Sequence, residues 1–147
     1  MKTTDLPVMR ATTQDFEAIT ELLQAAALPV AQSAEKVCFL VARNNGTICG
    51  CIGWERYDNV VLLRSLAVAP DQRNAGIASH LVKTAIAELK LQGACEFYLL
   101  TEHAAAFAER FGFQCCDRCS LPQQLQASAQ VNTGCCSSAQ AMRLFIV

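Results

Sequence analysis

The stretch Leu66-Ala-Val-Ala-Pro-Asp-Gln-Arg-Asn-Ala-Gly-Ile-Ala-Ser79 joins two regular segments through a short polar loop. The residues Val60–Val68 form an apolar run with the composition of a buried strand. After the loop, apolar residues recur at helical spacing over Ile77–Leu91. The loop carries the pattern Arg-x-x-Gly-x-Ala, with Arg73, Gly76 and Ala78 at its three fixed positions. A strand, a glycine-bearing loop and a helix start are the arrangement in which backbone N–H groups meet an anion.

We therefore expect this loop to form a cradle for a pyrophosphate. The helix start presents unpaired N–H groups and a partial positive charge. Gly76 allows the backbone to approach closely, and Ala78 keeps the next turn clear of a bulky ligand. Arg73 adds a fixed charge, and Ser79 offers a hydroxyl. The loop is neither a Walker motif nor a dinucleotide fingerprint, and an ordinary strand-to-helix turn with a glycine for tightness is the alternative.

The rest of the chain predicts one mixed α/β domain over residues 1–147. Asn44-Asn45-Gly46 indicates a tight hairpin turn, and a second turn is expected at Asp58-Asn59. Thr13 is the expected N-cap of the first helix, and Gly93 the glycine that ends the second. Periodicity predicts strands at 8–11, 38–42, 47–54, 60–68 and 97–100, helices at 15–27, 77–91 and 104–111, weaker strands at 115–119 and 141–146, and a helix followed by a loop within 123–138.

Length and composition limit the function classes. The 147 residues suffice for a core without disulfide staples. A formal net charge of −1 gives no reason to expect nucleic acid or a membrane as partner. No apolar run is long enough to span a bilayer, and residues 1–10 lack an apolar signal region, which predicts a cytoplasmic location. The nine cysteines are then expected to be reduced thiols.

Three separated segments together resemble the GCN5-related N-acetyltransferase (GNAT) superfamily. They are Arg64-Ser-Leu-Ala-Val-Ala-Pro70 with its loop, Tyr98-Leu-Leu-Thr101, and Phe107-Ala-Glu-Arg-Phe-Gly-Phe113. The resemblance covers about residues 8–119. It implies an antiparallel meander followed by splayed parallel strands, with helices on both faces. The strands at 60–68 and 97–101 would part, and the cosubstrate would fill the gap as an added strand does.

The resemblance implies acetyl-CoA as cosubstrate, with no metal. Backbone groups of one strand end would hold the pantetheine arm, the loop and helix start would hold the pyrophosphate, and the later short helix would lie along the cosubstrate. The residues implied in these roles are Leu66, Ala67 and Val68 for the arm, Arg73, Asn74, Ala75, Gly76, Ile77, Ala78 and Ser79 for the pyrophosphate, and Phe107 and Arg110 on the short helix.

The implied reaction is attack of a neutral amine on the thioester, for which a base or a water chain must accept a proton. A backbone N–H such as that of Val68 would stabilise the oxyanion. The family often has a tyrosine after the phenylalanine of the short helix, where this chain has Ala108. It also often has a glutamate in the strand that enters the loop, where this chain has Arg64.

Because both usual acid–base groups are missing, other polar residues are the catalytic candidates. Glu55 is a candidate base or ammonium holder, Arg64 an anion holder, and Thr101 a polar contact. The alternatives are a solvated turn residue for Glu55, an exposed strand residue for Arg64, and a helix cap for Thr101. His103 is interpreted as a surface residue.

A narrower resemblance concerns the acceptor. The motifs above, with Pro122 and Ser137-Ser-Ala-Gln-Ala-Met142, look like the small acetyltransferases found among arsenic-resistance genes, and these are similar to the acetyltransferase domain of N-acetylglutamate synthases. In the synthases an arginine two positions before the terminal serine helps to hold glutamate. Here Cys136 takes that position before Ser138, which argues against glutamate and favours another amino acid or an amino-acid-like toxin. The family also allows a homodimer.

Two other functions remain open. Cys116-x-x-Cys119 has a zinc-knuckle spacing and, with Cys135-Cys136, could form a thiolate site for zinc or a metalloid, although adjacent cysteines do not easily point at one metal. The missing tyrosine and glutamate also fit a module that binds acetyl-CoA without catalysis.

Overall fold

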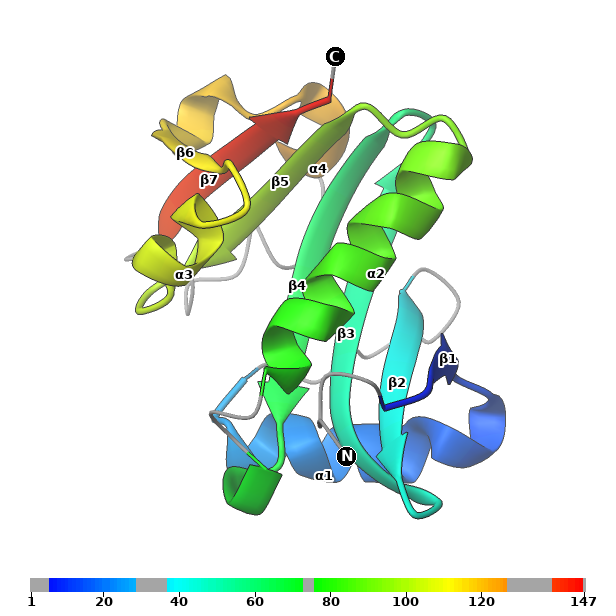
Figure 1. Cartoon of the computed structure of the whole chain (residues 1–147). Helices are drawn as coiled ribbons and strands as arrows, with labels where there is room; N and C mark the ends of the chain where they lie inside the picture. Colours follow the sequence, from blue (N-terminus) through cyan, green and yellow to red (C-terminus); the bar gives the residue numbers. More distant parts are fainter. Residues whose placement is uncertain (1–5, 29–36, 73–75, 127–138, 147) are drawn as a thin grey trace. The chain divides into compact units, whose positions relative to one another are not determined.

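The computed structural model describes residues 6–28, 37–72, 76–126 and 139–146. Within these residues, seven strands form one mixed sheet in the order β1-β2-β3-β4-β5-β7-β6 (Figure 1). The predicted mixed α/β fold is confirmed. The elements are β1 (Val8–Arg10), α1 (Phe16–Ala25), β2 (Cys38–Asn44), β3 (Thr47–Tyr57), β4 (Val60–Val68), α2 (Ile77–Leu91), β5 (Glu96–Thr101), α3 (Ala105–Glu109), β6 (Gln114–Cys116), α4 (Gln123–Gln126) and β7 (Gln140–Phe145).

The chain divides into two compact units. The first contains the described residues of Met1–Glu55 and Arg64–Gln92, and the second those of Arg56–Leu63 and Gly93–Val147. Strand β4 contributes to both, since the boundary falls between Leu63 and Arg64.

In the first unit, α1 and α2 cover opposite faces of the strands β2 and β3 (Figure 1). Strands β2 and β3 pair antiparallel through the predicted hairpin, where Asn45 and Gly46 both have positive φ, 55° and 82°. A Cβ on Gly50 would lie 3.1 Å from side-chain atoms of both Ile77 and Leu81, so α2 lies close against β3. The opposite face carries a core under α1, formed by Ile19, Leu23, Val37, Phe39, Val41, Cys51 and Ala67.

The start of the first helix differs from the prediction. A short 3-10 turn at Thr13–Asp15 precedes α1, and its N-cap is Thr12 rather than Thr13. The reason is Asp15, whose Oδ2 accepts the backbone N–H of Thr12 at 2.9 Å in a capping box. Asp15 Oδ1 also accepts a hydrogen bond from Arg43 Nη2 at 2.8 Å.

In the second unit, β7 lies between β5 and β6 and pairs antiparallel with both. The strand predicted at 115–119 is wrong in its second half, because the chain leaves β6 at Asp117 and forms a 3-10 turn at Arg118–Ser120. Ser120 Oγ closes that turn by donating to Asp117 O at 2.6 Å. The core consists of Val60, Leu62, Tyr98, Leu121, Leu125 and Ala141.

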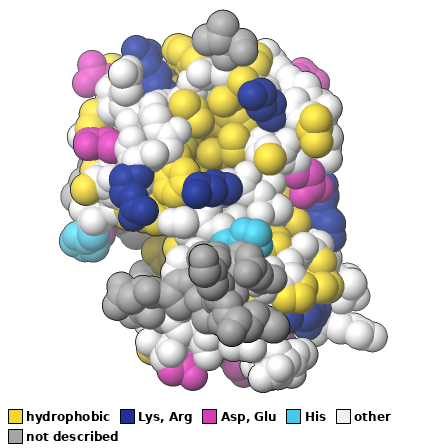
Figure 2. All heavy atoms as spheres, viewed as in Figure 1, with side chains coloured by type: hydrophobic (Ala, Val, Ile, Leu, Met, Phe, Trp, Pro, Cys, Tyr) yellow, Lys and Arg dark blue, Asp and Glu magenta, His cyan; other side chains and the backbone are white. Residues whose placement is uncertain are grey.

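The surface carries charges of both signs. Figure 2 shows acidic and basic side chains interspersed among the described residues of one face. In the part of the chain that the structure describes, no helix has the length and apolar character needed to cross a bilayer.

Candidate functional site

The loop that was predicted to bind a pyrophosphate ends in a left-handed glycine at the start of α2. Gly76 has φ of 81° and is the N-cap of α2. The backbone N–H of His80 donates to Gly76 O at 3.0 Å, so the N–H groups of Ile77, Ala78 and Ser79 precede the hydrogen-bond ladder of the helix. This geometry suits a phosphate group. Arg73, Asn74 and Ala75, which were predicted to complete the cradle, lie outside the described residues.

The predicted pantetheine segment lies beyond the part of β4 that pairs with β5. In the described residues, the parallel register joins Val60–Leu62 of β4 to Glu96–Tyr98 of β5 and ends there. Leu66, Ala67 and Val68 follow at the end of β4. Ala67 is buried in the core under α1, and Leu66 and Val68 are half-buried.

Two of the three catalytic candidates form a buried ion pair. Arg64 Nη1 lies 2.8 Å from Glu55 Oε2, and the two side chains are 8% and 7% exposed. The alternative interpretations of a solvated Glu55 and an exposed Arg64 are therefore wrong, whereas their catalytic roles stay predictions. A buried ion pair is costly to desolvate and adds little net stability, so its presence invites a functional explanation.

Next to this pair lies a residue that the sequence analysis did not single out. Ser65 has φ of 59° in the middle of β4, a conformation that non-glycine residues rarely adopt. Arg64 Nε donates to Ser65 Oγ at 3.2 Å, and Cys51 Sγ donates to Ser65 O at 3.4 Å. Nothing in the sequence marks Ser65, because serine is not a residue that favours positive φ.

The remaining candidates belong to the second unit. Thr101 Oγ1 accepts the backbone N–H of Ala104 at 2.8 Å, which is the capping contact of the alternative interpretation. On α3, the ring of Phe107 packs edge-on against Phe111 with centroids 5.1 Å apart, and the guanidinium of Arg110 lies 5.7 Å from its centroid.

Two further positions follow the sequence-based expectations. Ala108, at the family's tyrosine position, is buried at 4% exposure and cannot supply an acid. His103 lies at the surface, with its side chain 92% exposed.

The structure describes only part of the cysteine cluster that the sequence suggests. Among the described residues, no three His, Cys, Asp or Glu side chains are placed to hold one metal ion. Cys115 is exposed and Cys116 half-buried, and burial raises the pKa of Cys116. Cys135 and Cys136 lie outside the described residues. All seven described cysteines are free thiols.

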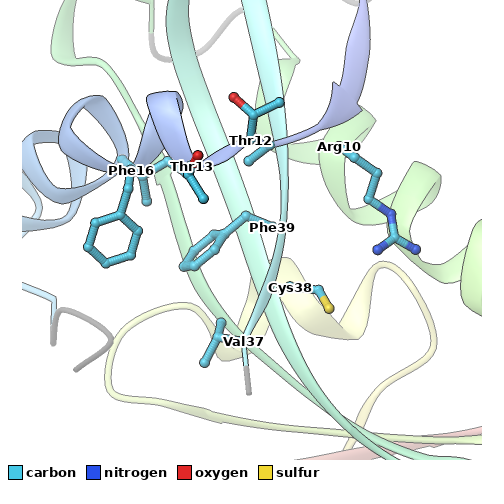
Figure 3. Close-up of a pocket in the computed structure, with 9 residues that line it drawn as sticks. Arg10, Thr12, Thr13, Phe16, Val37, Cys38 and Phe39 are labelled. Atoms are coloured by element: carbon cyan, nitrogen blue, oxygen red, sulfur yellow. The ribbon is translucent and has the colours of Figure 1, made fainter. Parts of the chain in front are cut away.

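The structure also contains a pocket of about 460 Å³ that the sequence did not predict. Figure 3 shows the rings of Phe16 and Phe39 on one side of the start of β2, with Arg10 extending to the other side. The pocket includes none of the residues predicted for the cosubstrate or the acceptor. Its lining residues are Arg10, Ala11, Thr12, Thr13, Phe16, Ile19, Val37, Cys38 and Phe39.

Comparison with known proteins adds independent information. A family model described as an acetyltransferase (GNAT) domain matches residues 35–115. An uncharacterized N-acetyltransferase of Chlorobaculum tepidum is 30% identical over 134 residues, which are 85% of this chain and 86% of that protein.

Solved structures share the fold at lower identity. N-acetylglutamate synthase from Neisseria gonorrhoeae, complexed with coenzyme A and N-acetyl-glutamate, is similar with a TM-score of 0.81 and 17% identity over 97% of this chain. The match covers 35% of the Neisseria chain, so the present chain spans about a third of that protein. The Mycobacterium tuberculosis protein Rv2747, in complex with CoA, has a TM-score of 0.80 and 19% identity, over 96% of this chain and 99% of that one. From the family model and the Chlorobaculum relative, we conclude that the chain belongs to the GCN5-related (GNAT) family of N-acetyltransferases.

Proposed function

We propose that this protein transfers the acetyl group of acetyl-CoA to the amine of a small molecule, either an amino acid or an amino-acid-like toxin. The observation that carries the proposal is the buried Glu55–Arg64 pair, which lies just before the strand end Leu66–Val68. The carboxylate of Glu55 is largely shielded from water, and such a group can bind an ammonium and accept its proton.

Several residues support acetyl-CoA as the cosubstrate. The left-handed Gly76 precedes a helix of 15 residues whose first N–H groups have no acceptor within the helix, which suits a pyrophosphate. Leu66–Val68 lie beyond the part of β4 that pairs with β5, and backbone groups on that edge can meet the amides of the pantetheine arm. Two structures with the same fold were solved with CoA.

In the proposed reaction, Glu55 binds the acceptor's ammonium and takes its proton, so that the neutral nitrogen can attack. The nitrogen forms a bond to the acetyl carbon, and a backbone N–H such as that of Val68 stabilises the oxyanion. The C–S bond then breaks, and the second proton of the nitrogen passes to the departing sulfur, which leaves as the CoA thiol. Arg64 orients the Glu55 carboxylate through Nη1. It meets an anion of the acceptor only with the guanidinium N–H groups that are not turned to Glu55 and Ser65.

The acceptor class rests on the sequence resemblance and on the fold. The Neisseria synthase was solved with N-acetyl-glutamate, which makes an amino acid a reasonable acceptor class for a similar fold. Cys136, where the synthases have an arginine, argues against glutamate itself. Several other expectations stay predictions. They are the arsenic-resistance context, the extent of the domain over 1–147, a cytoplasmic location, a homodimer, and the roles of Thr101, Phe107 and Arg110.

The test is calorimetric titration with acetyl-CoA, followed by a thiol-release screen over amino acids and their phosphinic and arsenic analogues. We expect binding, and release with one class of amine. Glu55→Gln removes the basic carboxylate but keeps a side-chain oxygen that can accept from Arg64, so it should abolish most of the release while keeping acetyl-CoA binding. The matched control is Glu88→Gln, which removes the charge from the exposed pair that Glu88 forms with Arg10 and should change neither quantity.

Other outcomes point to the alternatives. Binding without release for any amine would favour a non-catalytic acetyl-CoA sensor. If acetyl-CoA does not bind at all, the cradle is misassigned, and metal titration of the thiols at 115–119 and 135–136 becomes the next experiment.

A further inference from the structure

The middle of β4 contains a break in the alternation of its side chains. In a regular strand, residues three apart point to opposite faces. Arg64 contacts Glu55, which shares a face of β3 with Cys51 because the two are four residues apart. Ala67 packs in one core with Cys51, so it lies on that face too. Arg64 and Ala67 therefore share a face. The left-handed Ser65 between them interrupts the alternation by one residue, as the extra residue of a β-bulge does.

This conformation has to be held in place. A left-handed non-glycine residue costs about 1–2 kcal/mol, and such residues persist where their surroundings fix them. Two side chains do so here. Cys51 Sγ donates to the carbonyl oxygen of Ser65 at 3.4 Å, and Arg64 Nε donates to its hydroxyl at 3.2 Å. Arg64 is in turn fixed by Glu55 at 2.8 Å.

The thiol of Cys51 stays protonated and can therefore keep donating this hydrogen bond. Cys51 is fully buried, and burial raises its pKa to about 12. It therefore keeps its proton and remains a donor throughout the physiological pH range. Because Cys51 belongs to β3, its hydrogen bond joins the Ser65 carbonyl to the neighbouring, largely buried strand.

The residues that follow Ser65 are those assigned to the cosubstrate. The phase of the strand after Ser65 decides the direction in which the N–H and C=O groups of Leu66, Ala67 and Val68 point. We propose that Cys51 is a positioning residue, whose thiol holds Ser65 left-handed and thereby aims the backbone groups of Leu66–Val68 at acetyl-CoA. This inference rests on the proposed binding of acetyl-CoA by those residues.

The test uses a matched pair of buried thiols. Cys49 lies two residues before Cys51 on β3, is 3% exposed, and donates to Ala42 O at 3.5 Å rather than to Ser65. Cys51→Ala and Cys49→Ala should lower the melting temperature by similar amounts. Only Cys51→Ala should weaken acetyl-CoA binding, by about tenfold in calorimetric Kd and in KM. The reason is that a small displacement of the backbone groups of Leu66–Val68 weakens their contacts with acetyl-CoA. Equal Kd values for the two variants would overturn the inference.

A second comparison separates positioning from packing. Glycine adopts positive φ without strain, so a Ser65→Gly background makes the thiol dispensable. We expect Cys51→Ala to change the acetyl-CoA Kd much less in that background than in the native one. An unchanged effect in both backgrounds would mean that the thiol acts only through the core.

Ser65→Val, with both thiols intact, provides an independent check should Cys51→Ala fold poorly. A β-branched residue is strongly disfavoured at positive φ and should weaken acetyl-CoA binding, and full affinity would contradict the inference. If the wild-type protein does not bind acetyl-CoA, the proposed function fails. If the wild type binds and the thiol variants bind equally well, only the positioning role fails.

Discussion

Arg64 Nη1 donates to Glu55 Oε2 across 2.8 Å, and this ion pair joins β3 to β4 with both side chains less than a tenth exposed. Each charge has lost most of its water, and the contact between them compensates part of that loss. Removing one partner leaves the other charge buried and without this contact, whereas replacing both with apolar side chains removes the desolvation cost as well. Comparing the stability and the activity of the single and double variants therefore tells a functional ion pair from one that serves stability.

We predict that Arg64→Met lowers the free energy of unfolding by about 3–5 kcal/mol, because the buried carboxylate of Glu55 loses its contact with the guanidinium. The double variant Glu55→Leu/Arg64→Met should recover most of that loss, yet it should have no acetyl transfer. Urea unfolding and the thiol-release assay measure the two quantities. A double variant as unstable as the single one would show that the pair serves the fold.

The Asp15 carboxylate predicts a pH dependence of stability. The backbone N–H of Thr12 and then the guanidinium of Arg43 hold the pKa of Asp15 below its ordinary value. A depressed pKa means that Asp15 stabilises the folded protein above its unfolded pKa of about 3.9, and that this stabilisation is lost as the pH falls through the lower folded value. Asp15→Ala should therefore cost about 1 kcal/mol at pH 7, and this cost should shrink below about pH 4.

The matched control for Asp15 is Glu17→Ala, which removes an exposed acid from the first turn of α1. Its effect on urea unfolding should be small at both pH values. If the difference between wild type and Asp15→Ala stayed constant down to pH 3, the capping box and the Arg43 contact would not depend on the charge of Asp15.

The sequence predicted the regular elements best where local signals agree. The bounds of β4 and α2 coincide with the prediction, because an apolar run, a polar loop and a terminal glycine delimit them. The shorter α3 and β6 were overextended, since an element of a few residues has no full period from which to set its ends. The Thr12 N-cap was missed by one residue because two threonines are adjacent.

The candidate site was predictable only in part. Glu55 and Arg64 flank the predicted turn at Asp58-Asn59, so their presence on neighbouring strands follows from the sequence. Their burial does not, because it depends on what packs over both strands. The left-handed Ser65 depends on Cys51, fourteen residues earlier, and pattern analysis has no signal for such a non-local contact.

The pyrophosphate cradle can be tested by comparing two left-handed glycines that bracket α2. Gly76 precedes the helix with φ of 81°, and Gly93 follows it with φ of 97° and open space where a Cβ would lie. An alanine forced into this conformation costs about 1–2 kcal/mol, so Gly76→Ala and Gly93→Ala should lower the unfolding free energy similarly. Only Gly76→Ala should also weaken acetyl-CoA binding in calorimetry, because its Cβ meets a ligand as well as the backbone. Equal affinities for the two variants would reduce Gly76 to the tight turn of an ordinary loop, and the pyrophosphate would have to bind elsewhere.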